Sequence, residues 1–67
     1  MKGKIVGVSG GGTLYIIWVK KEDNGVFNIP VEHRYFSRII GDKGDIVGKK
    51  IDYRGECIYF AEDLESV

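Results

Sequence analysis

Cysteine and histidine are the side chains best suited to nucleophilic or metal chemistry, and each occurs once in this 67-residue sequence, as Cys57 and His33. A catalytic cysteine needs a base within hydrogen-bonding reach, and a structural zinc ion needs four ligands. Nothing in the spacing brings these two residues together. His33 falls on the polar side of a predicted helix, and Cys57 lies between a turn and a strand as a small hydrophobe. We therefore expect no enzymatic activity, no metal site and no cofactor.

Three glycine-rich or acidic segments have the composition of ligand loops but lack the rest of the pattern. SGGGT (9–13) clusters backbone N–H groups that can bind an anion. A phosphate loop continues with a lysine and a helix, however, whereas a strand is predicted here. EDNG (22–25) and GDKGD (41–45) lack the alternating carboxylates and the distal glutamate of calcium loops. We interpret all three segments as turns.

Aromatic and basic side chains on the predicted strands have the most functional content. Proteins bind single-stranded nucleic acid by stacking its bases on aromatic rings within a basic groove. Trp18, the single tryptophan, is assigned to the core instead. With two apolar residues of the second strand, whose role is explained below, the candidate binding residues are Tyr15, Ile17, Val19, Lys20, Phe27, Lys49, Lys50, Tyr53 and Arg54.

Composition limits the classes of function. Ten basic residues balance ten acidic ones, so the formal net charge is zero, which argues against a broad affinity for nucleic acid but leaves a local basic patch open. No segment has the length of a membrane span or of a signal sequence, so we expect a cytoplasmic protein with no membrane partner. An unpaired cysteine suits that compartment. The absence of glutamine and the abundance of Ile, Val, Lys and Glu are compatible with a thermophilic source.

Turn residues and hydrophobic periodicity divide the chain into six elements. Gly10–Gly12 and the pair Asn24-Gly25 are hairpin signals, so the first three strands should form an antiparallel meander. Apolar residues at helical spacing predict one helix between the third and fourth strands. The predicted strands are 2–8, 13–22, 25–29, one within 46–55 and 57–62; the helix lies within 30–41, and the tail forms at most one short turn.

This order predicts a single domain over residues 1–67 and a mainly β fold. Strands and helix follow the sequence β-β-β-α-β-β, which is the element order of a five-stranded OB-like barrel with one short helix. An SH3-like barrel is the second choice, and a hairpin-rich sheet covered by the helix is the third. The glycines Gly3 and Gly7 in the first strand predict a bend or a close approach of another backbone.

The second strand poses a packing problem, because residues 14–19 are apolar on both faces. Large exposed apolar patches usually mark an interface. We expect Leu14, Ile16 and Trp18 to point into the barrel, because burying an indole suits a chain with so little core. The opposite face, formed by Tyr15, Ile17 and Val19, should then be covered by the helix and by a second copy of the chain.

These arguments predict an interaction module that is not an enzyme. It would self-associate as a homodimer or bind a protein partner through the apolar face of the second strand. The alternative is a single-stranded nucleic-acid-binding domain that uses the aromatic and basic residues.

Overall fold

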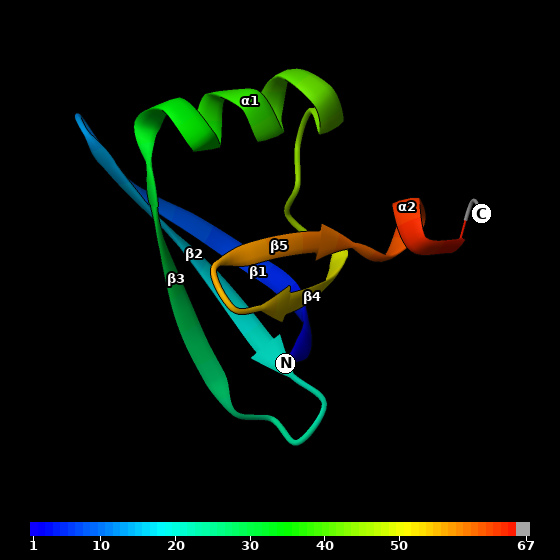
Figure 1. The fold of residues 1–67 in the computed structure, drawn as a ribbon. Coiled ribbons are helices and arrows are strands. Elements are labelled where there is room, and N and C mark those ends of the chain that lie inside the picture. The colour runs from blue at the N-terminus through cyan, green and yellow to red at the C-terminus, as the bar shows by residue number, and fades with distance from the viewer. Residues whose placement is uncertain (66–67) are drawn as a thin grey trace.

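The computed structural model describes residues 1–65, which form five strands and two helices (Figure 1). The elements are β1 (Lys2–Gly11), β2 (Leu14–Lys21), β3 (Val26–Glu32), α1 (His33–Lys43), β4 (Lys50–Arg54), β5 (Cys57–Phe60) and α2 (Ala61–Glu65). The helix between the third and fourth strands is therefore confirmed. The last strand ends two residues earlier than predicted, because the short α2 begins at Ala61; residues 66 and 67 of the tail lie outside the described part of the chain.

All five strands belong to one antiparallel sheet in the order β3-β2-β1-β4-β5. The meander β1-β2-β3 is as predicted. The sheet curls so far that Phe27 of β3 and Tyr53 of β4 stack with ring centroids 6.3 Å apart. No ladder joins β3 to β5 within residues 1–65, so the sheet is open there and the closed barrel is not shown.

A β-bulge in β1 changes which residues face the core. The register with β2 shifts between Ile5 and Gly7, which inserts Val6 as an extra residue. Ile5 is fully buried, Val6 is exposed and Val8 packs against the core. Strict alternation of side chains along the strand would put Val6 and Val8 on one face and Ile5 on the other. The bulge reverses this phase, so Ile5 and Val8 both face the core.

The predicted orientation of β2 is also wrong. Ile17 and Val19 are fully buried, whereas Leu14 is 48% and Trp18 37% exposed. Ile17 lies opposite Ile29 of β3, and Val19 lies opposite Ile5 of β1, so the β-branched residues of three strands meet on one face. The interior is filled by these residues rather than by the indole. A single chain therefore buries Ile17 and Val19, and no second copy is needed to cover them.

The helix α1 begins and ends two to three residues later than predicted. Pro30 lies inside β3 rather than in the first helical turn, which is compatible with the sheet because β3 is an edge strand. The helix ends at Gly44, not Gly41: Gly44 has φ 71° and donates its N–H to the Ile40 carbonyl at 2.8 Å.

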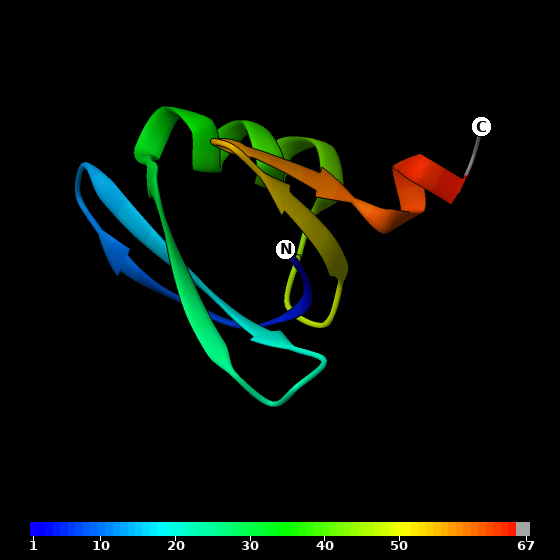
Figure 2. The ribbon, with the colours of Figure 1, turned by 60° about the horizontal axis from the view of Figure 1, so that its bottom comes forward.

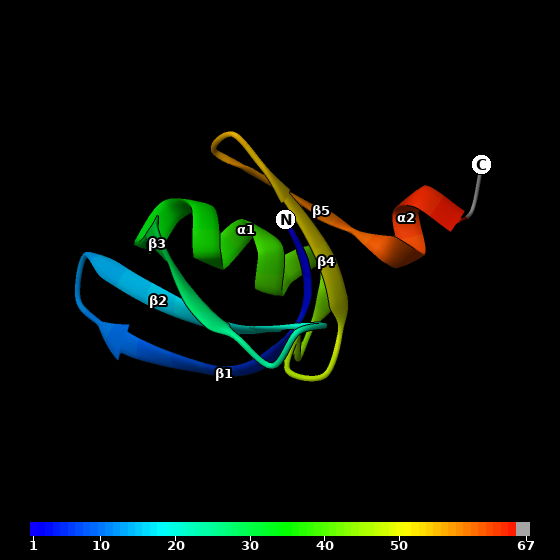
Figure 3. The same ribbon diagram turned by 90° about the horizontal axis from the view of Figure 1, so that it is seen from below.

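The helix covers the open side of the sheet, between β2–β3 and β4–β5 (Figures 2 and 3). Phe36 stacks on Tyr15 of β2 with a centroid distance of 4.2 Å, and Ile39 is buried. The Tyr35 hydroxyl accepts a hydrogen bond from the backbone N–H of Ile58 in β5 at 3.5 Å. The helix thus connects β2 with β5 through side chains.

Candidate binding groove

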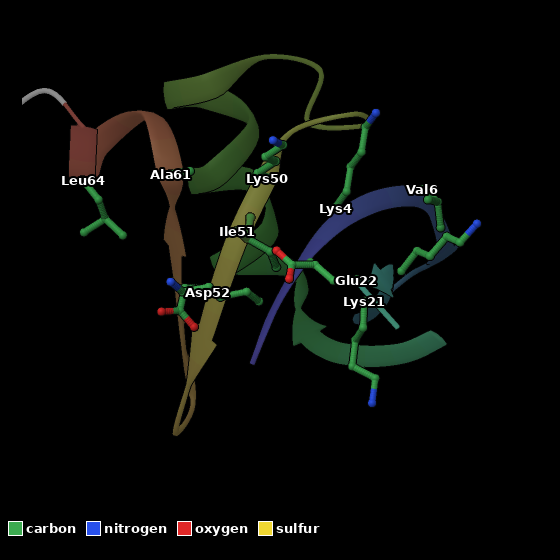
Figure 4. Close-up of a pocket in the computed structure, with 12 residues that line it drawn as sticks. Lys4, Val6, Lys21, Glu22, Lys50, Ile51, Asp52, Ala61 and Leu64 are labelled. Atoms are coloured by element: carbon green, nitrogen blue, oxygen red, sulfur yellow. The ribbon is translucent and has the colours of Figure 1, made fainter. Parts of the chain in front are cut away.

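A groove of about 530 Å³ lies beside the first half of β1 and is lined also by the end of β2, by β4 and by α2 (Figure 4). We call it the lysine groove. Its apolar residues are Val6, Ile51, Ala61 and Leu64. Its charged residues are Lys2, Lys4, Lys20, Lys21, Lys50, Glu22 and Asp52.

The register of the strands brings three of the groove's lysines together. Lys4 lies opposite Lys20 in the β1–β2 ladder and opposite Lys50 in the β1–β4 ladder. Three lysines therefore form a row across three adjacent strands, which we call the lysine row. Directly opposed residues have Cβ atoms about 5 Å apart, and like charges in such pairs destabilise a sheet. Within residues 1–65, none of the three lies within ion-pair distance of a carboxylate.

The charge of one of the two carboxylates in the groove, Asp52, is balanced by neighbouring cations. Asp52 is 6% exposed and accepts a hydrogen bond from Arg54 Nε at 2.7 Å, and the Met1 ammonium lies 3.4 Å away. The Arg54 hydrogen bond is the main reason that the pKa of Asp52 lies below its ordinary value, with a smaller contribution from the ammonium, while desolvation acts in the opposite direction. Glu22 is the remaining carboxylate, against five lysines.

Glu62 and Asp63 of α2 form ion pairs with lysines that do not line the groove. Glu62 pairs with Lys49 at 3.3 Å and with Lys43 at 3.4 Å, and Asp63 pairs with Lys43 at 2.5 Å. The hydrogen bond from Lys49, with help from Lys43, lowers the pKa of Glu62. Ala61 and Leu64 of α2 line the groove, whereas Glu62 and Asp63 do not.

The structure separates the nine predicted binding residues into three groups. Two of them, Lys20 and Lys50, lie in the lysine groove. Ion pairs engage two others, because Lys49 pairs with Glu62 and Arg54 with Asp52. The remaining five face the interior and are buried or half-buried: Tyr15, Ile17, Val19, Phe27 and Tyr53.

Sequence reasoning did not select Lys2 or Lys4, which both line the groove. The alternation of Lys2 and Lys4 with Gly3 and Ile5 was a visible signal that both lysines share a face. Their neighbours were not visible, because the β1–β4 ladder joins residues almost 50 positions apart.

The two side chains singled out for nucleophilic or metal chemistry, His33 and Cys57, lie on different elements, α1 and β5. No cluster of three or more His, Cys, Asp or Glu side chains within residues 1–65 has the geometry to hold a metal ion. His33 stacks on Tyr15 at 5.6 Å and lies 3.4 Å from the Ser37 hydroxyl, and Cys57 is exposed on β5. Among the described residues, no helix is both long enough and apolar enough to span a membrane.

Comparisons of the chain with protein-family models, with curated proteins and with solved structures gave no match. The groove must therefore be interpreted from its own geometry.

Proposed function

We propose that this protein is a non-enzymatic binding module whose lysine groove binds a phosphate-rich polymer. The observation that carries the proposal is the lysine row, Lys20–Lys4–Lys50. Three lysines at directly opposed positions lower the stability of a sheet, because their charges repel one another. A polyanion lying across the three strands would relieve their repulsion and release its own counterions.

The zero net charge of the chain is compatible with this proposal because the charges are segregated. Basic residues outnumber acidic ones in the groove, while Glu62 and Asp63 are paired on the other side of α2. A ligand therefore meets a local positive field in a molecule with no overall charge. We expect an affinity that is modest and strongly dependent on salt.

The fold is compatible with an OB-like architecture, which we retain as part of the proposal. The OB fold is a partly open five-stranded Greek-key barrel, and the stacking of Phe27 of β3 on Tyr53 of β4, which requires a strongly curled sheet, supports this part of the proposal. The groove, however, lies at the end of β1 and β2 opposite the turn at 12–13. It is therefore not at the loops that flank the ligand in typical OB folds, and the fold alone does not indicate the ligand.

Charge-removing variants test the proposal. Long-chain inorganic polyphosphate is titrated into the full chain at several salt concentrations, and binding is followed by calorimetry. Lys4→Gln, Lys20→Gln and Lys50→Gln should each weaken binding and reduce the slope of log affinity against log salt by roughly 0.7–0.9. The matched control is Arg38→Gln, which removes one positive charge from the exposed part of α1. Equal losses in all four variants, or no binding at low salt, would refute the groove.

A protein partner or a second copy of this chain is the second candidate, because the outer face of the sheet carries exposed apolar side chains. Leu14, Trp18 and Val26 all lie on this face. If it is an interface, sedimentation should show association that rises with protein concentration and is insensitive to salt. Leu14→Lys should abolish that association, whereas Lys4→Gln should leave it unchanged.

A further inference from the structure

We infer that the polymer is single-stranded nucleic acid, with Trp18 as the ring on which an unpaired base stacks. The inference rests on the proposed function and identifies the class of its ligand. It depends on the position, the orientation and the exposure of the Trp18 indole.

Trp18 continues the basic surface along β2. It lies two residues before Lys20, so the two side chains share the outer face and are separated by about 7 Å along the strand. Val6, which lines the lysine groove, is the bulged residue next to Gly7, and Gly7 is the partner of Trp18 in the β1–β2 ladder. A polymer that contacts Lys4 and Lys20 can therefore reach the indole along β1 and β2.

A hydrogen bond fixes the indole. Its Nε1–H donates to the Ser9 hydroxyl at 2.8 Å. An indole has one donor and no acceptor, so this bond satisfies its whole polar capacity. What Trp18 can offer a ligand is then its ring face, which stacks on any base regardless of sequence.

The surroundings of the indole are open. Its neighbours across the two ladders are Gly7, which has no side chain, and the exposed Asn28. A Cβ atom added to Gly7 would meet no heavy atom within 4 Å, so there is free space beside the ring. Trp18 is 37% exposed, so part of its ring is accessible to a ligand.

Three kinds of polyanion differ in how well they fit an exposed ring next to a row of lysines. Polyphosphate can satisfy the lysines but has no base. A duplex offers phosphates, but its bases are already stacked on one another. A single strand satisfies both features, since it carries phosphates and unpaired bases that stack on aromatic rings.

The test uses the full chain at low salt with three probes matched in phosphate number: oligothymidylate, a duplex of ordinary sequence and inorganic polyphosphate. Trp18 is the only tryptophan, so its fluorescence reports stacking directly. We expect oligothymidylate to quench Trp18 and to bind most tightly. Polyphosphate should bind without quenching.

Two variants change the stacking surface without changing the charge. Trp18→Leu should weaken binding of oligothymidylate by roughly five- to 150-fold, the range found when a stacking residue is truncated, and leave polyphosphate binding unchanged. Gly7→Val should act in the same direction by filling the space beside the ring. Thermal melting of each variant in the absence of ligand is the control for folding.

Each outcome decides one of the two proposals. If all three probes bind alike and Trp18→Leu affects none of them, or if the duplex binds most tightly, the single-strand inference is wrong and the polyanion groove stands. If no probe binds to the folded protein at low salt, the groove itself is refuted. If oligothymidylate binds most tightly and quenches Trp18, if polyphosphate binds without quenching, and if both variants weaken only the binding of oligothymidylate, the inference is supported.

Discussion

Lys4 and Lys20 face each other directly across the β1–β2 ladder, and neither lies within ion-pair distance of a carboxylate in the described part of the chain. Such a pair costs stability in a free sheet. Its presence therefore connects the stability of the fold to the binding proposed for the groove.

Removing one charge from the lysine row should stabilise the unliganded protein. We expect Lys4→Gln to raise the free energy of unfolding by roughly 0.2–1 kcal/mol at low salt, as measured by urea denaturation. The gain should shrink as salt screens the repulsion. Arg38→Gln is the control and should change little, because Arg38 is exposed on α1. A destabilised Lys4→Gln protein would show that the row is held by interactions other than those described.

Two glycines of β1 should respond in opposite ways to alanine. A Cβ atom at Gly3 would lie 2.5 Å from Val19 Cγ1 and 2.7 Å from the Lys20 carbonyl oxygen, whereas at Gly7 it would meet nothing. Gly3→Ala should therefore destabilise the protein by about 1–3 kcal/mol, as overpacking does. Gly7→Ala should be neutral or slightly stabilising. Chemical denaturation of both variants checks the contrast, and a tolerated Gly3→Ala would contradict the close approach of β1 and β2.

Lysine substitutions on the two faces of β2 should separate its interior from its surface. Ile17→Lys places an unpaired charge in the core, because Ile17 is fully buried, and should unfold a domain of this size. Leu14→Lys changes a half-exposed residue and should shift the free energy of unfolding by no more than about 0.5 kcal/mol. Circular dichroism and melting distinguish the two. A folded, dissociated Ile17→Lys monomer would restore the orientation first predicted from sequence.

Acid should destabilise the protein partly through Asp52 and Glu62. Arg54 and Lys49, respectively, are the main reasons that the pKa values of these two carboxyls lie below their ordinary values of 3.8 and 4.5. A depressed pKa in the folded state contributes stability that is fully present above the unfolded-state value and is lost as the pH falls through the folded-state value. The loss should therefore occur at and below the ordinary carboxyl range.

Melting temperature measured against pH checks this expectation. Asp52→Asn and Glu62→Gln should each flatten the acid limb of the curve, while Glu56→Gln, a change in the exposed β4–β5 turn, serves as the control. An acid limb that is identical in all three variants would show that neither ion-pair group contributes.

Local signals in the sequence predicted the parts of the fold that depend on neighbouring residues. The Asn24-Gly25 hairpin formed because Asn24 takes a positive φ of 70° and the Lys21 N–H donates to the Gly25 carbonyl at 2.7 Å. Gly3 is approached closely by β2, as its position in a strand suggested. The helix also lies where its apolar spacing placed it, apart from its ends.

What the sequence did not predict depends on packing between distant segments. The six apolar residues 14–19 did not indicate which face of β2 is interior. The interior face is the one on which Val19 lies opposite Ile5 and Ile17 lies opposite Ile29. The bulge at Val6 then changed the phase of β1. The lysine row needed the register of β4 against β1, which no local pattern contains.

In the described part of the chain, β3 and β5 are the two edge strands of the open sheet, and both are unsuited to adding a strand from another molecule. Pro30 interrupts the donors of β3, and on β5 the Ile58 N–H already donates to Tyr35. Edge-to-edge growth into fibrils should therefore be slow even at high protein concentration, although the sheet never closes. Pro30 and Tyr35 would then protect the folded protein against aggregation through its edge strands.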